Sequence, residues 1–68
     1  MNEKKIYPYL GRNFIDGKPY VVLFNDVEQG MVVMNDTNNT ELAVGTYDSF
    51  AEEVFEILPP NEFVRLSN

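Results

Sequence analysis

Short apolar runs alternate with turn residues along the whole chain, a pattern typical of a small β-rich fold. Five runs have the length of strands, and they cover residues 6–10, 20–24, 31–34, 41–44 and 63–66. Gly, Asn and Asp lie between them, and these residue types favour turns because they tolerate left-handed backbone or bond their own turn amides. The pattern therefore predicts four strands, a short helix and a closing strand.

Three local signals refine this prediction. Pro8 places the run 6–10 at a sheet edge or a bulge, because proline has no amide hydrogen to donate to a neighbouring strand. Asp16-Gly17 is typical of a two-residue hairpin turn, since Gly tolerates the positive φ that the turn requires. Residues 20–24 are apolar throughout, which predicts a central strand.

One segment has the pattern of a short amphipathic helix. Ser49 is followed three residues later by Glu52, as in a capping box, and Pro59 and Pro60 stop the helix. Apolar and acidic side chains then fall on opposite faces at helical spacing. The apolar face holds Phe50, Val54, Phe55 and Leu58, and the acidic face holds Glu52, Glu53 and Glu56.

We expect a single small domain over residues 1–68, because 68 residues are too few for two domains. The fold class is mainly β with one short helix. Five short strands bury their apolar faces most easily as a five-stranded curved sheet or a small barrel, with the helix before the last strand. A chain of this size buries only about 60% of the surface of its unfolded form, so self-association is a way to gain stability.

The residues that most enzymes need are missing. The chain has no Cys and no His, and its serines, Ser49 and Ser67, have no His to activate them. Its four glycines are dispersed, so no phosphate-binding loop is formed. The turn at Asp26, Glu28 and Gly30 is too short for a calcium loop of about twelve residues. We therefore expect a protein that is not an enzyme and that needs no cofactor and no metal.

Charge narrows the choice of partner. The net charge is −6 and the pI is about 4.3, whereas nucleic-acid binders and proteins that bind anionic membranes need a positive surface. We expect no direct nucleic-acid binding and no membrane binding, and a protein partner with a basic surface. No apolar run has the length of a signal peptide or a membrane span, which together with the lack of Cys indicates the cytoplasm.

Two groups of residues are candidates for partner binding. The acidic group is a helix face that is either simply solvated, with acids near the helix N-terminus complementing its dipole, or a docking face for a basic partner. The tyrosines either form an aromatic groove for an extended peptide or lie half-buried with their hydroxyls at the rim. The candidate residues are Asp48, Glu52, Glu53 and Glu56 in the first group and Tyr7, Tyr9 and Tyr47 in the second.

The order of elements is similar to that of the Src-homology-three-like small barrels, in which a short helical turn precedes the closing strand. Two stretches carry this resemblance: residues 5–9, Lys-Ile-Tyr-Pro-Tyr, look like the opening Ala-Leu-Tyr-Asp-Tyr of that family, and residues 58–64 look like its closing Pro-Ser-Asn-Tyr-Val with one extra residue. The resemblance implies the barrel architecture. The chain has no Trp, on which the peptide groove of that family depends.

A second resemblance covers most of the chain. Residues 7–11, Tyr-Pro-Tyr-Leu-Gly, are followed by Gly17 with the strand 21–24, by 30–33, by 41–47 and by 51–55. This order resembles small accessory proteins of tailed bacteriophages that begin with Tyr-Pro-Tyr-Ile-Gly. The resemblance implies a phage gene product that acts in the host cytoplasm by binding and inhibiting or redirecting a host protein, in host takeover or anti-defence.

The leading hypothesis is thus a non-enzymatic, acidic protein-binding module. One alternative is a peptide-binding small barrel that uses surface tyrosines, and the other is a structural or assembly subunit. A homodimer is also expected, through the edge strand 6–10 and the apolar side chains of Met31 and Met34.

Overall fold

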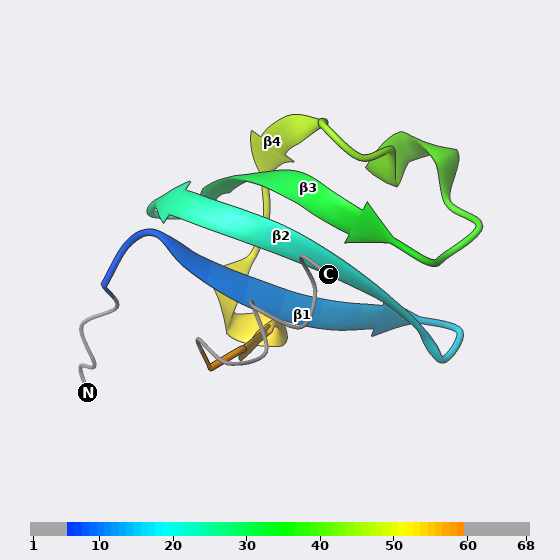
Figure 1. Cartoon of the computed structure of the whole chain (residues 1–68), viewed down its shortest axis with the longest axis horizontal. Coiled ribbons are helices and arrows are strands. Elements are labelled where there is room, and N and C mark those ends of the chain that lie inside the picture. Colours follow the sequence, from blue (N-terminus) through cyan, green and yellow to red (C-terminus); the bar gives the residue numbers. More distant parts are fainter. Residues whose placement is uncertain (1–5, 60–68) are drawn as a thin grey trace.

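The computed structural model describes residues 6–59. Five strands in this range form one antiparallel sheet. The strands lie in the order β4-β3-β2-β1-β5 (Figure 1). Two single 3₁₀ turns, η1 and η2, precede β4 and β5. The elements are β1 (Tyr9–Ile15), β2 (Lys18–Asp26), β3 (Gln29–Asn35), η1 (Thr40–Leu42), β4 (Tyr47–Ser49), η2 (Glu52–Val54) and β5 (Glu56–Ile57). The prediction of a mainly β, five-stranded small fold is confirmed.

The central strand is β2, as its apolar run predicts. It pairs with β1 along one side and with β3 along the other. Val21, Val22 and Phe24 are fully buried, although consecutive side chains of a strand point to opposite faces. Both faces of the sheet are therefore covered at its centre.

The hairpin between β1 and β2 turns at the predicted dipeptide. Ile15 pairs with Lys18, and the two residues between them, Asp16 and Gly17, have φ values of 54° and 77°. Positive φ at both central positions is the geometry of the tight turn that matches the twist of the flanking strands.

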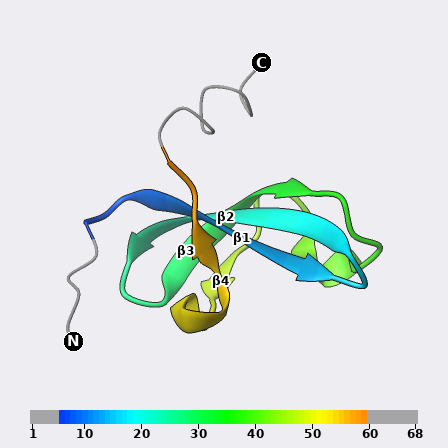
Figure 2. The same ribbon diagram turned by 90° about the horizontal axis from the view of Figure 1, so that it is seen from below.

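The first face of the sheet carries the larger core. Tyr20, Val22, Phe24 and Val32 project from it, and Phe55 covers them. Residues 50–55 cross this face between the two outer strands (Figures 1 and 2). The Phe24 and Phe55 rings meet edge to face, with centroids 5.1 Å apart, an arrangement that aromatic quadrupoles favour.

The second face carries a smaller core of Leu10, Val21 and Leu58. Leu58 reaches it because its amide donates to the carbonyl of Leu10 at 2.8 Å. The register between β2 and β3 shifts beside these residues, so that Val33 is an extra residue opposite the Val21–Val22 step. Such a bulge strengthens the local twist of a sheet and bends it.

The predicted helix at 49–58 is wrong in detail. This segment forms the end of β4, the single 3₁₀ turn η2 and then β5. The outer strands are separated along the sheet by four spacings, about 19 Å, whereas a helix over residues 49–56 would advance only about 10 Å. Pairing of β5 with β1 and packing of Phe55 on the first face therefore override the helical pattern.

Other boundaries also differ. The first strand runs over 9–15 rather than 6–10, and the predicted strand 41–44 is replaced by η1 and a turn in which Gly45 has a φ of 99°. Asn39 starts η1 because its side chain accepts a hydrogen bond from the amide of Glu41. The sheet is curved but not closed, since no pairing joins β4 to β5 within residues 6–59. The predicted closing strand 63–66 lies outside the described residues.

The Asp16-Gly17 turn gives the first prediction. A Cβ at Gly17 meets no atom within 4 Å, so substitution there tests backbone strain without a steric clash. We expect Gly17→Val to lower the free energy of unfolding by about 1 kcal/mol or more, because a β-branched residue disfavours left-handed backbone. Gly17→Asn is the control and should cost less, since Asn tolerates that region. Equal losses in urea unfolding would contradict the assignment.

Candidate functional site

A buried carboxylate lies where the N-terminal segment, the β2–β3 turn and η2 meet. Glu52, the first residue of η2, is only 7% exposed. Its Oε1 accepts a hydrogen bond from the Tyr9 hydroxyl at 2.5 Å, and the Tyr7 hydroxyl lies 3.1 Å from both carboxylate oxygens. Its Oε2 also accepts the backbone amide of Glu28 at 2.5 Å. We call these groups the Glu52 cluster.

The Glu52 cluster joins parts of the chain that are far apart in sequence. Tyr7 and Tyr9 lie more than 40 residues before Glu52, and Glu28 lies in the middle of the chain. A carboxyl group is costly to bury unless its oxygens accept hydrogen bonds, and three protein donors serve this one. The arrangement is therefore a structural clamp at one end of the sheet.

The clamp favours neutral tyrosine hydroxyls. Burial and the hydrogen bond to Glu52 raise the pKa of Tyr9 above its ordinary value of about 10, and they act in the same direction on the pKa of Tyr7. The charges of Asp26 and Glu28 raise the pKa of Tyr7 further. A hydroxyl donates to a carboxylate only while it keeps its proton, so the cluster depends on both tyrosines staying neutral.

The predicted acidic face is therefore split. Glu52 is buried in the clamp rather than exposed beside Glu53, and Ser49 belongs to β4 rather than capping a helix. The Ser49 amide donates to the Asp48 side chain at 2.8 Å, which removes the predicted capping box. Sequence alone could not identify the clamp, because its partners are distant tyrosines and a turn amide.

Glu56 lies apart from the other acids. It is exposed on β5 and accepts a hydrogen bond at 2.6 Å from Nε of Arg12, its cross-strand partner. The second guanidinium nitrogen of Arg12 forms an ion pair with the same carboxylate. Exposed pairs of this kind contribute little to stability, on the order of 1 kcal/mol or less. Their effect here is to neutralise the charge of Glu56.

Four exposed acids gather at the end of the sheet that holds the β2–β3 turn. Asp26 precedes that turn and Glu28 lies in it. The carbonyl of Glu28 accepts the Phe50 amide at 3.0 Å, which brings the chain leaving β4 next to the turn. Asp48 and Glu53 lie on either side of Phe50 along this chain. We call the exposed residues Asp26, Glu28, Asp48 and Glu53 the acidic end. Sequence reasoning missed Asp26 and Glu28 because it assigned them only to a turn.

The tyrosines do not form one groove. Tyr7 and Tyr9 belong to the clamp, with ring centroids 5.5 Å apart, and Tyr20 is buried in the first-face core. Tyr47 is on β4, 52% exposed, and its hydroxyl donates to Asn25 at 2.9 Å. The predicted set of Tyr7, Tyr9 and Tyr47 is thus divided between a structural cluster and a sheet edge.

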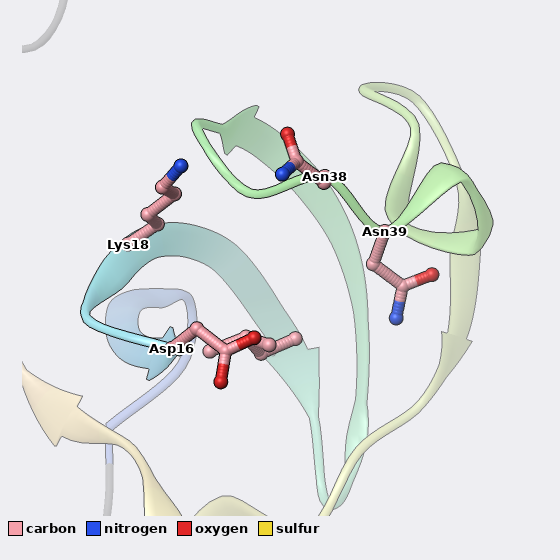
Figure 3. A pocket seen from close by; sticks show the side chains of 5 residues that line it. Asp16, Lys18, Asn38 and Asn39 are labelled. Atoms are coloured by element: carbon pink, nitrogen blue, oxygen red, sulfur yellow. The ribbon is translucent and has the colours of Figure 1, made fainter.

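The surface of the sheet has two hollows. One has a volume of about 270 Å³ and lies along β4, lined by Gln29, Tyr47, Asp48 and Ser49. The other has a volume of about 500 Å³ and lies at the opposite end of the sheet. Figure 3 shows that Asp16 and Lys18 come to it from the β1–β2 hairpin, and Asn38 and Asn39 from the loop after β3. The lining of that second hollow includes one acid, Asp16, and one base, Lys18, so it favours neither a positive nor a negative ligand.

The described residues contain no group of three or more Asp and Glu side chains placed to hold a metal ion. No helix within residues 6–59 is long and apolar enough to cross a membrane. Comparison of the chain with protein-family models, curated proteins and solved structures found no significant match. The two resemblances noted in the sequence therefore remain predictions.

The clamp gives a prediction with a matched control. Glu52→Gln keeps the side-chain size but removes the charge and replaces one of the two acceptor oxygens by an NH₂ group, so that at least one donor loses its charge-assisted hydrogen bond. We expect a loss of about 1–3 kcal/mol in the free energy of unfolding. Glu53→Gln changes the same charge at the exposed neighbour and should stay within about 0.5 kcal/mol of the wild type. Urea unfolding of both variants measures the difference, and similar small losses would contradict a structural role for Glu52.

Raised tyrosine pKa values predict how stability depends on pH. Above pH about 10 the unfolded chain loses tyrosine protons that the folded chain keeps, so the free energy of unfolding should fall as the pH rises further. The Tyr7→Phe, Tyr9→Phe double variant lacks these protons and should show a flatter decline. Unfolding measured across this alkaline range tests the claim, together with the ultraviolet absorbance of tyrosinate. Parallel declines in the two proteins would contradict it.

Proposed function

We propose that this protein is a non-enzymatic binding module whose acidic end contacts a basic surface of a partner protein. The observation that supports the proposal most is the separation of charge over residues 6–59. Nine Asp and Glu side chains are present there, but the basic residues are only Arg12 and Lys18. Neither of these bases lies at the acidic end.

Within residues 6–59, neither base is placed to compensate the charge of the acidic end. Arg12 is paired with Glu56 on β1 and β5. Lys18 starts β2 beside the hairpin tip, at the end of the sheet opposite the β2–β3 turn. The carboxylates of the acidic end therefore project a field that attracts a positively charged surface, speeds encounter and disfavours acidic partners.

Within this proposal, the residues that support the surface differ from those that contact the partner. The clamp holds the β2–β3 turn and η2 together through Glu52, so Glu28 and Glu53 are presented from fixed backbone. Side chains displayed on a rigid frame lose less conformational entropy when they bind. Within the proposal, Asp48 and Glu53 contact the partner, whereas Glu52, Tyr7 and Tyr9 maintain the surface.

A host-directed role is the narrower form of this proposal. It rests on the resemblance to small accessory proteins of tailed phages, which implies a protein that binds and inhibits or redirects a host protein. In that setting the acidic end would occupy a basic surface of the target in the host cytoplasm. An assembly subunit is the alternative, in which the partner is another component of the same particle.

The test compares the same charge change at the two ends of the sheet. A partner captured by the immobilised protein is identified, purified and titrated against variants. Asp48→Asn with Glu53→Gln should weaken binding about tenfold or more, roughly 1.4 kcal/mol. Added salt should shrink the difference from wild type, because exposed charges are screened.

Asp36→Asn with Glu41→Gln is the control, since both side chains are exposed at the other end, around the loop after β3. It removes the same net charge and should change the affinity less than about twofold. Equal effects of the two double variants would show that only the overall charge matters. An unchanged affinity for both would exclude the acidic end as the contact surface.

A further inference from the structure

The outer edge of β4 is open to another strand. The carbonyl of Thr46 accepts the Val32 amide, and the Phe50 amide donates to the Glu28 carbonyl. Backbone groups of successive residues in an antiparallel strand point to alternate sides. The amide and carbonyl of Asp48 therefore face β3, as the bonding groups of Thr46 and Phe50 do, and those of Tyr47 and Ser49 face away from it. The outward groups are the amides and carbonyls of Tyr47 and Ser49.

One of the four outward groups is already used. The Ser49 amide donates to the Asp48 side chain, whereas no hydrogen bond donated by the Tyr47 amide is seen among the described residues. All three residues of β4 are exposed, and the hollow of about 270 Å³ runs beside them. The edge thus offers one donor and two acceptors with room next to them.

The two sides of this edge differ in chemistry. Tyr47 pairs with Met31, which pairs with Leu23, so these side chains form a row on the second face. Tyr47 is 52% and Met31 39% exposed, which leaves an apolar step at the edge. Asp48 pairs with Gly30, and Gly30 pairs with Phe24 on the next strand. The Asp48 side chain therefore lies on the first face, toward the acidic end.

We propose that β4 is a docking edge for an extended segment of a basic partner, which adds to the sheet as a sixth strand. Its apolar side chains lie over Tyr47 and Met31, and its alternate, basic side chains lie over Asp48 and the acidic end. Strand addition supplies affinity through backbone hydrogen bonds and specificity through alternate side chains. The inference rests on the proposed function and specifies how the partner binds.

Charge favours this occupant over a second copy of the chain. Two β4 edges paired antiparallel about their middle residue would bring the two Asp48 side chains together, with both acidic ends nearby. Like charges placed directly opposite each other on paired strands are destabilising. Short, charged edge strands are also a recognised way in which proteins prevent pairing with their own copies. A partner strand with lysine or arginine at alternate positions removes the repulsion.

The probe is the peptide acetyl-Lys-Val-Lys-Val-Lys-Val-Lys-amide, and the control is its block isomer, with four lysines followed by three valines. We expect NMR shift changes at residues 46–49 and binding of the block isomer that is weaker by about tenfold or more. Exchange of the Tyr47 amide hydrogen should slow at least about tenfold at saturating peptide, because that amide becomes a hydrogen-bond donor. No binding at millimolar peptide would overturn the proposal.

N-methylation identifies the backbone bonds. One version of the peptide carries N-methyl groups on its lysines and another carries them on its valines. Strand addition uses the amides of only one edge, so one version should retain binding and the other should lose at least about tenfold. Equal losses, or none, would overturn strand addition. If binding still required Asp48, Glu53 and low salt, the acidic-end proposal would stand.

The protein side has a matching pair of variants. Tyr47→Ala removes the side chain and keeps the outward amide, whereas Tyr47→Pro removes both, at an edge position where proline is tolerated. We expect Tyr47→Pro to bind at least about tenfold more weakly than Tyr47→Ala, and equal binding would overturn the role of the amide. Slower Tyr47 exchange at higher protein concentration, without peptide, would assign the edge to a second copy instead.

Discussion

The buried Glu52 carboxylate is the constraint on which the arrangement of this small sheet depends. Its oxygens accept hydrogen bonds from Tyr7, Tyr9 and the Glu28 amide, so one side chain fixes three distant segments. Phe55, three residues later, then packs on Phe24 and carries the chain to β5. The chain has no disulfides, and this polar clamp holds the segment that crosses the first face in one position.

Parts of the fold that depend on neighbouring residues were predictable. The run 20–24 identified the central strand, and Asp16-Gly17 located the first hairpin, because apolar periodicity and turn geometry act over a few residues. The observed path of residues 49–58, a 3₁₀ turn between two short strands, was not predictable in this way. Phe50 and Phe55 pack together on Phe24 in an extended crossing segment. Taken with Val54 and Leu58, the same apolar positions also fit the apolar face of a helix.

The candidate site shows the same division. Asp48, Glu53 and Tyr47 are exposed, as a contact surface requires. The run of acids around the predicted helix and the grouping of tyrosines were enough to identify them as candidates. Glu52 was assigned to the same surface because its burial depends on tyrosines more than 40 residues away. Asp26, Glu28 and the open edge of β4 became visible only once the strand order placed them.

Clamp and edge together make one account: an end of the sheet held by hydrogen bonds to Glu52, with exposed carboxylates beside a strand whose outer edge is open. Amide hydrogen exchange of the free protein tests it most directly, because it reads both features at single residues. The account predicts a slowly exchanging Glu28 amide, although that residue is exposed in a turn, and a rapidly exchanging Tyr47 amide on β4. A Glu28 amide that exchanges as fast as the Tyr47 amide would contradict it.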